Sequence, residues 1–166
     1  KLNPEVVNKS KLFDRSTIKS INLKNRFICS ATWQGKANFN GSCSPTLISS
    51  MLPVARGETG LIISEMTYVL QNGICAPGQM GIYDNSLLPG LKLMTEFVRR
   101  AESQIVLQLV HGGLFSAPIL TGSTPLGPSV LETPDGKTGK EMSKDEIAET
   151  IIAFCKGFPI RPHLYF

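Results

Sequence analysis

The chain has 166 residues, of which 42% are hydrophobic and 18% charged, and its formal net charge is +4. No apolar run is long enough to span a bilayer, and no element interleaves basic with aromatic residues, so the composition argues against a membrane-spanning or nucleic-acid-binding protein. The four cysteines form no C-x-x-C pair and only two histidines are present, which argues against a metal site and favours a reducing, cytoplasmic location.

The amino-terminal segment is basic and predicts only short strands. Residues 12–23 alternate weakly, which indicates a hairpin that closes the bottom of a sheet. Seven basic but only two acidic residues precede residue 27. These cations either steer phosphate-bearing ligands or are ordinary solvated loop and strand edges, and the second interpretation needs fewer assumptions. No signal peptide is visible and the first residue is not Met, so we expect a fragment or a processed chain.

Three short apolar runs, at residues 26–31, 60–66 and 104–110, are separated by stretches with helical periodicity. Parallel strands buried on both faces read as continuous apolar runs, because crossover helices cover them. The alternation therefore predicts an α/β fold built from consecutive βα units.

Capping residues mark where the helices begin. Ser44 is followed by a proline at the first helical position, and Asp84 or Ser86 precedes the next stretch of helical periodicity. Ser143 and Glu146 form a capping box ahead of a third helix. The sequence therefore predicts one helix after each apolar run.

The length is a further clue to the fold. Three strands use about 110 residues, whereas an eight-stranded (β/α) barrel needs roughly 250. Residues 114–142 are rich in proline and glycine and are expected to form an irregular loop, either a functional lid or a loose connection. From about residue 157 glycine and proline interrupt the helical pattern, and no fourth strand follows. We therefore expect either an open sheet or part of a longer barrel.

Polar side chains end each predicted strand. In parallel α/β folds, ligands collect at the carboxyl ends of the strands, so the chemistry is expected there. The side chains predicted at this edge are Ser30, Thr32, Ser64, Glu65, Gln108 and His111. No P-loop, dinucleotide-binding glycine motif or G-x-S-x-G elbow accompanies them, so none of these familiar sites is supported.

Three of these side chains allow two interpretations each. The amide of Gln108 offers a donor and an acceptor side by side, which suits the imide-like edge of a flavin or nucleobase, but it can equally bond a neighbouring strand in the core. Glu65 is either a buried carboxylate that braces the fold, which is the simpler view, or an acid/base group. His111 either contacts an anion or, more simply, bonds loop backbone.

Several short motifs occur in order along the chain. They are LKNR at 23–26 leading into SATWQG at 30–35, GLIISE at 60–65, PGQ at 77–79 with GIY at 81–83, QL at 108–109 with His111 and Gly113, GPS at 127–129, and EMS at 141–143. Together these motifs resemble the Old Yellow Enzyme family of FMN-dependent NAD(P)H oxidoreductases over about residues 12–154.

The resemblance implies an FMN lying across the carboxyl ends of the barrel strands. Gln108 would bond the pyrimidine edge of the flavin, residues 30–33 would approach its N5 and O4 side, and Met66 would pass close to the ring. The implied cofactor-binding residues are Ser30, Ala31, Thr32, Trp33, Met66 and Gln108. The implied reaction is hydride transfer from NADH or NADPH to flavin N5 and then to an electron-poor alkene or similar small-molecule acceptor.

The resemblance also implies the amino-terminal portion of a (β/α)8 TIM barrel, truncated after about three βα units. Residues 1–156 would belong to the FMN-binding domain, and residues 157–166 would form a divergent tail. The family's substrate-anchoring His/Asn pair and proton-donating Tyr belong to later strands, so no catalytic residue is predicted. Met66, Trp33 and Leu114 depart from the family pattern. The alternatives are a non-catalytic α/β interaction module, with a homo-oligomer or a complementing chain as its partner, and a non-functional truncated product.

Overall fold

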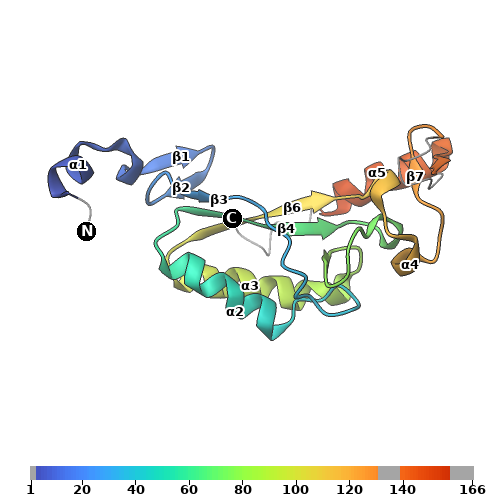
Figure 1. Cartoon of the computed structure of the whole chain (residues 1–166), viewed down its shortest axis with the longest axis horizontal. Helices are drawn as coiled ribbons and strands as arrows, with labels where there is room; N and C mark the ends of the chain where they lie inside the picture. Colours follow the sequence, from blue (N-terminus) through green and yellow to red (C-terminus); the bar gives the residue numbers. More distant parts are fainter. Residues whose placement is uncertain (1–2, 131–138, 158–166) are drawn as a thin grey trace.

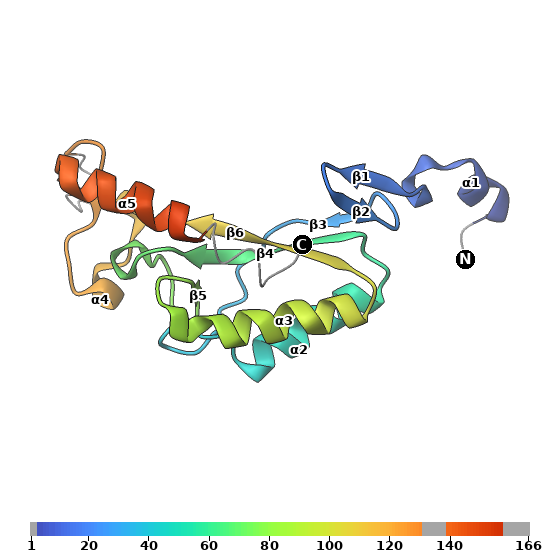
Figure 2. The same ribbon diagram turned by 180° about the vertical axis from the view of Figure 1, so that it is seen from behind.

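A computed structural model describes residues 3–130 and 139–157 of the chain. A parallel sheet runs through the middle of the molecule, and helices α2 (Pro45–Arg56) and α3 (Leu88–Arg100) cover one of its faces (Figure 1). Seen from behind, helix α5 (Lys144–Gly157) lies past the tip of strand β6 (Gln104–Val110), away from α2 and α3 (Figure 2). The layers are therefore those of an α/β protein.

The predicted hairpin over residues 12–23 is confirmed. Strand β1 (Ser16–Ile18) pairs antiparallel with β2 (Ile21–Leu23). A short helix α1 (Pro4–Lys9) and a 3-10 turn at Lys11–Phe13 precede it. In both views, the hairpin and α1 extend from the end of the sheet opposite to α5 (Figures 1 and 2).

Strand β4 (Leu61–Tyr68) is the centre of the parallel sheet. Strand β3 (Ile28–Cys29) pairs beside its first half and β5 (Met80–Gly81) beside its second half, while β6 runs along its other side. These pairings confirm the predicted βα order. However, β3 is shorter than the predicted strand over 26–31, because only two of its residues pair with β4 before the chain leaves the sheet.

Strand β4 carries a β-bulge that no sequence pattern indicated. Ile63 pairs with Val106 and Met66 pairs with Gln108, so two residues of β4 lie opposite a single residue of β6. The two residues of the bulge, Ser64 and Glu65, have no register partner on β6, and both are buried. A bulge breaks the strict alternation of side chains, and here it returns Met66 to the same face of the sheet as Gln108.

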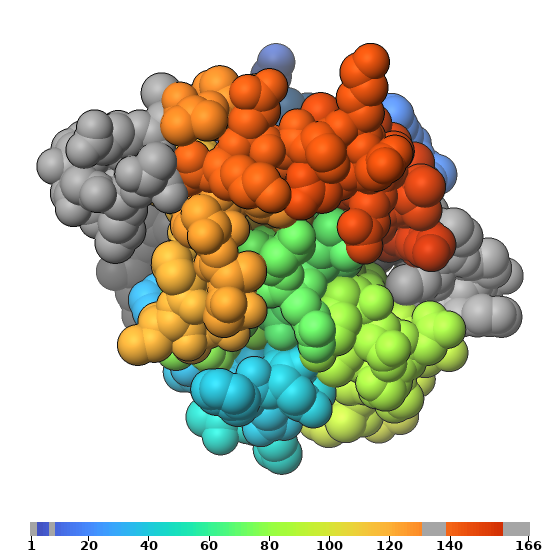
Figure 3. Space-filling view, turned by 90° about the vertical axis from the view of Figure 1, so that its right-hand side faces the viewer, coloured from blue at the N-terminus to red at the C-terminus, as the bar shows by residue number. Residues whose placement is uncertain are grey.

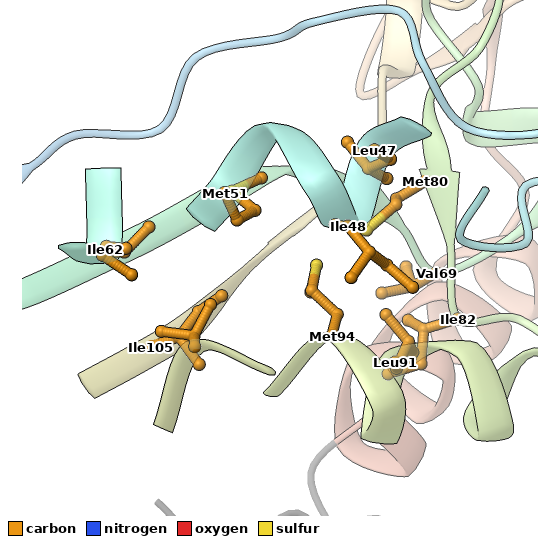
Figure 4. Close-up of a cluster of buried hydrophobic side chains, with 12 residues drawn as sticks. Leu47, Ile48, Met51, Ile62, Val69, Met80, Ile82, Leu91, Met94 and Ile105 are labelled. Carbon is orange, nitrogen blue, oxygen red and sulfur yellow. The ribbon is translucent and has the colours of Figure 1, made fainter. Parts of the chain in front are cut away.

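The core lies between the sheet and the two covering helices (Figure 4). Its buried side chains are Leu47, Ile48, Met51, Ala55, Ile62, Val69, Met80, Ile82, Leu91, Met94, Val98 and Ile105. Because Ile105 faces the helices, the alternate residues Gln104, Val106 and Gln108 face the other side of the sheet. We call this side, which α2 and α3 leave uncovered, the open face.

The predicted helix starts are largely confirmed. Ser44 caps α2 through its side chain, and Ser143 and Glu146 form the expected capping box at the start of α5. Asp84 caps a 3-10 turn (Asn85–Leu87), and α3 itself begins at Leu88, two residues after Ser86, the second of the two predicted starts. Local hydrogen bonds that a side chain makes within a few residues are encoded nearby in the sequence, which explains why these starts were predictable.

The region after β6 contains more regular structure than its composition suggested. The prediction of an irregular loop over 114–142 was wrong in part, because backbone hydrogen bonds form short elements there. They are a 3-10 turn at Gly113–Phe115, α4 (Pro118–Thr121), and the parallel pair β7 (Leu126–Gly127) and β8 (Lys140–Glu141). A 3-10 turn also follows β4, at Gln71–Gly73.

Two predictions fall on residues that the structure does not describe. The loop over 131–138 and the tail over 158–166 lie outside the described ranges, so the boundary proposed after residue 156 stays a prediction. Within residues 3–130 and 139–157, no helix combines the length and the apolar character needed to cross a membrane.

Candidate functional site

The carboxyl ends of β4 and β6 emerge at one edge of the molecule, which Figure 3 shows face on. Helix α5 crosses the top of this view, the chain that follows β4 occupies the middle, and the chain that follows β3 lies below. The strand order places β4 between β3 and β6. Met66 of β4 therefore lies between the segment 30–33, which continues β3, and Gln108 of β6.

Gln108 presents its amide to solvent on the open face. It is the register partner of Met66 in a neighbouring strand, and adjacent strands lie about 4.8 Å apart. Gln108 is exposed, and no side-chain hydrogen bond involves it within the described part of the chain. The interpretation of Gln108 as a core residue bonded to a neighbouring strand is therefore wrong, and its donor and acceptor are free for a ligand.

Hydroxyl groups hold the bulge beneath Met66 and Gln108. The backbone N–H of Gln108 donates to Ser64 Oγ at 3.3 Å, and Ser64 Oγ donates to the carbonyl of Glu65 at 3.0 Å. The hydroxyl of Thr67 donates to the same carbonyl at 3.1 Å. These bonds replace ladder hydrogen bonds that the bulge displaces, so the register of Gln108 against Met66 is fixed locally.

The segment 30–33 is accessible over most of its length. Ser30, Thr32 and Trp33 are exposed and Ala31 is half-buried. The hydroxyl of Thr32 donates to the carbonyl of Ser30 at 3.4 Å, a bond within the segment. Trp33, the single tryptophan of the chain, is 45% exposed. The segment thus offers hydroxyls, backbone groups and one aromatic ring to a ligand beside β4.

Glu65 connects this segment to the sheet. It is 1% exposed, and its Oε2 accepts the backbone N–H of Gln34 at 2.8 Å. Burial raises the pKa of the Glu65 carboxyl above its usual value, although the backbone amides of Gln34 and Met80 and the charge of Lys36 act in the opposite direction. The structure supports the simpler expectation, that Glu65 braces the fold.

Two glycines complete this connection, and sequence reasoning did not anticipate them. Gly35 and Gly78 both have left-handed backbone conformations, with φ of +65° and +66°. A Cβ at Gly78 would collide with the backbone of Gly35. Next to this contact, the N–H of Ala37 donates to the carbonyl of Gly78 at 2.9 Å. The two glycines allow the chain after β3 to lie directly against the chain before β5, a contact whose only sequence signal is the glycine in each motif.

His111 serves the loop after β6, as the simpler interpretation predicted. Its Nδ1 accepts the N–H of Gly113 at 3.1 Å, and its Nε2 lies 3.1 Å from Oδ1 of Asn72. With Nδ1 accepting, the proton belongs on Nε2 and is donated to Asn72. Burial lowers the pKa of the imidazole, which favours this neutral form.

All four cysteines are free thiols. Cys29 and Cys43 pack against the core, and Cys43 Sγ lies 3.5 Å from the sulfur of Met80. Burial, with a smaller effect of the nearby Glu65, raises the pKa of Cys43 to about 12, so its thiol is inert at neutral pH. Among the residues with described positions, no three His, Cys, Asp or Glu side chains gather in a way that would hold a metal ion.

Arg15 and Lys24, two of the basic amino-terminal residues, lie at the opposite end of the sheet from Gln108. A broad cavity of about 1050 Å³ there is lined by Arg15, Lys24 and Arg99, together with Glu102 and the buried Ser103. The structure brings two of the predicted basic residues together with a third, but the acidic Glu102 shares the cavity. Whether these charges steer phosphate-bearing ligands stays a prediction.

A second cavity of about 330 Å³ lies among the loops at the carboxyl edge. It is lined by Phe39, Tyr68 and Tyr83, and the two tyrosine rings stack with their centroids 5.3 Å apart. None of the six predicted flavin-binding residues lines it. These residues lie instead on the open face of the sheet, which carries Met66 and Gln108, and in the segment 30–33.

Comparison with known proteins gives a consistent result. Residues 11–157 match the sequence model of the NADH:flavin oxidoreductase / NADH oxidase family. An NADPH dehydrogenase from Bacillus licheniformis is 31% identical over 149 residues, which are 89% of this chain and 43% of that protein. An NADPH dehydrogenase from Clostridium acetobutylicum is also 31% identical, over 87% of this chain and 42% of its own length.

Solved structures show the same relationship in three dimensions. The old yellow enzyme homologue from Zymomonas mobilis superposes with a TM-score of 0.82 at 26% identity, over 95% of this chain and 46% of that one. Morphinone reductase superposes with a TM-score of 0.81 at 23% identity, a likeness of fold. The chain thus spans less than half the length of the proteins it matches.

Proposed function

The chain belongs to the NADH:flavin oxidoreductase / NADH oxidase family, and on this premise we propose that it carries one part of an FMN-dependent NAD(P)H oxidoreductase site of Old Yellow Enzyme type. Its fold is the corresponding portion of a TIM barrel, with three βα units in the described residues. The activity itself belongs to the proposal, as do a substrate that is an electron-poor alkene or similar small molecule and a flavin-binding domain over residues 1–156. When bound, FMN supplies the hydride chemistry, taking a hydride from NADH or NADPH and passing it to the acceptor.

One observation carries the proposal: the exposed amide of Gln108 lies beside Met66 on the open face. The pyrimidine edge of a flavin alternates donors and acceptors, and a primary amide is complementary to such an edge. Met66 offers an unbranched, polarisable side chain that can lie against a flat ring. The donor set of this face therefore fits the isoalloxazine group of FMN.

The segment 30–33 would complete the contact on the other side of Met66. Ser30 and Thr32 carry exposed hydroxyls, and backbone N–H groups that point at a ring nitrogen or oxygen stabilise negative charge there. Trp33 would limit the space beside the ring. No residue of the described chain is assigned to proton donation or to substrate anchoring, and the proposal concerns cofactor binding alone.

A titration of the isotope-labelled 166-residue chain with FMN tests the proposal. Two-dimensional amide spectra should show shifts that concentrate on residues 30–33, Met66 and the side-chain amide of Gln108. Replacing Gln108 by Ala should weaken binding roughly tenfold, since losing a hydrogen-bonding partner costs about 1 kcal/mol or more. Gln104→Ala is the matched control, because Gln104 lies on the same face of the same strand at its other end.

The titration has a clear contrary result. If FMN causes no shifts, or if Gln104→Ala weakens binding as much as Gln108→Ala, the open face at Gln108 is not the flavin site. Binding is expected to be weak for this chain, because Gln108, Met66 and residues 30–33 would contact only part of the flavin. The spectra remain informative under weak binding, since they report which residues respond.

We propose two further properties that the sequence predicted. A cytoplasmic location is supported by four free cysteines, which a reducing compartment preserves.

An association with a second copy or a complementing chain is supported by exposed Ile147, Ile151 and Ile152 on α5. Within the described residues, strand β6 pairs only with β4, which leaves its outer edge available. Size-exclusion chromatography with light scattering would distinguish a defined oligomer, which is also what the non-catalytic interaction module predicts, from a monomer.

A further inference from the structure

We infer that Glu65 is a positioning residue for the proposed flavin site: its buried carboxyl group holds the segment 30–34 in place beside β4. The inference rests on the proposed function for its link to flavin binding. Glu65 would touch neither the flavin nor the substrate. It would instead hold in place the residues of the segment 30–34 that contact the flavin.

Few hydrogen bonds hold the segment 30–34 in place. Strand pairing ends at Cys29, whose thiol donates to the adjacent carbonyl of Ser30, and the hydroxyl of Thr32 donates to the same carbonyl within the segment. Among the described residues, the bond from Gln34 N–H to Glu65 Oε2 at 2.8 Å is the single hydrogen bond that joins residues 30–34 to an element other than β3. Glu65 therefore fixes the far end of a segment whose near end is fixed by β3.

The bulge of β4 determines where the Glu65 side chain lies. Ser64 and Glu65 are the two residues of β4 without a register partner on β6, and both are buried. The carbonyl of Glu65 accepts hydroxyl hydrogen bonds from Ser64 and Thr67, which hold the bulge closed. The same bulge thus sets Gln108 through Ser64 and sets residues 30–34 through Glu65.

The surroundings of the Glu65 carboxyl group require a hydrogen-bond acceptor and not a charge. Glu65 Oε1 is buried and has no hydrogen-bond partner within the described residues. The single oxygen that is bonded accepts a backbone N–H, which a neutral carboxyl or an amide can do equally well. The Lys36 side chain, whose charge acts on this carboxyl group, is exposed and donates to Gln34 Oε1 at 3.1 Å. Glutamine should therefore replace Glu65, whereas leucine should not.

The ligand-free chain allows a direct test, because Trp33 is its single tryptophan and adjoins Gln34. Glu65→Leu should shift Trp33 emission to longer wavelength and accelerate exchange of the Gln34 amide proton by at least about tenfold. Glu65→Gln should change neither. In both variants, amide protons of the β4–β6 ladder report whether the sheet has folded.

Ser103→Ala is the matched control for a general loss of stability. Ser103 is 1% exposed and bonds two backbone carbonyls at the other end of the sheet. It should leave Trp33 emission and Gln34 exchange unchanged. If Glu65→Leu does not fold, replacing the amide bond between Trp33 and Gln34 by an ester removes the same donor without changing Glu65, and Trp33 emission, the single readout for this variant, should shift to longer wavelength.

The flavin readout separates this inference from the proposed function. If the unmodified chain binds FMN at the open face, Glu65→Leu should raise the dissociation constant about tenfold and Glu65→Gln less than twofold. If FMN does not bind at all, the proposed function fails, but the emission and exchange results still decide whether Glu65 holds the segment. Unchanged emission and exchange in Glu65→Leu, or equal changes in Glu65→Gln, would overturn the inference.

Discussion

Replacing Gly78 by Ala should destabilise the chain far more than the same replacement at Gly122, although both glycines have φ of +66°. An alanine in this left-handed conformation costs about 1–2 kcal/mol whatever surrounds it. Nothing lies within 4 Å of a Cβ placed on Gly122, so Gly122→Ala pays this cost alone. A Cβ on Gly78 would strike the backbone of Gly35, which cannot rotate away as a flexible side chain can.

The second cost at Gly78 is that of overpacking, about 1–3 kcal/mol when backbone must shift. We therefore expect Gly78→Ala to lower the free energy of unfolding by about 2–5 kcal/mol and Gly122→Ala by about 1–2 kcal/mol. For a chain of this length each kcal/mol lowers the melting temperature by about 2–4 °C. Urea unfolding followed by circular dichroism measures both values. Equal losses in the two variants would show that the chain after β3 does not lie against Gly78 in solution.

Three further predictions concern other parts of the fold. Ser103→Ala removes a hydroxyl that donates at 3.1 and 2.6 Å to two backbone carbonyls, so urea unfolding should show a loss of about 1–3 kcal/mol; a loss below about 0.5 kcal/mol would contradict it. Ser143→Ala removes the side-chain cap of α5, a helix with no buried residue, so helical circular dichroism should fall before the sheet unfolds, and a single unchanged transition would argue against this. Because the folded state lowers the pKa of His111, the unfolded chain binds the proton more readily, and stability should fall as the pH drops below about 6.5. His111→Asn should remove that component of the pH dependence in unfolding experiments at pH 7.5 and 5.5, and an unchanged dependence would show that other groups cause it.

Local patterns predicted the elements well, because their signals lie within a few residues of each other. The apolar run at 104–110 became β6 with those bounds, and Ser44 caps α2 as expected. The capping box of Ser143 and Glu146 likewise formed. In each case a side chain and the backbone it stabilises are neighbours in the sequence, so no knowledge of the tertiary fold was needed.

The arrangement around the candidate site was less predictable, because partners far apart in the sequence determine it. The bulge at Ser64 and Glu65 lies in a run that reads as an ordinary buried strand, and it exists only through the register with β6. The contact of Gly35 with Gly78 joins two loops whose glycines could each have served a turn alone. The motifs that resemble the family brought these residues to attention, but they did not indicate the contacts between them.

The bulge also explains how the proposed flavin site can be positioned within this chain. Gln108 is fixed to β4 through the hydroxyl of Ser64, and the segment 30–34 is fixed to β4 through the carboxyl group of Glu65. Both bonds are accepted by adjacent residues of β4, Ser64 and Glu65. Hydrogen bonds inside the described fold therefore set where Gln108 lies relative to the segment 30–34. Residues elsewhere would add contacts to the flavin without having to position these groups. Weak binding of FMN would then reflect a small number of contacts, whereas displacement of Trp33 or Gln108 in the ligand-free chain would contradict this account.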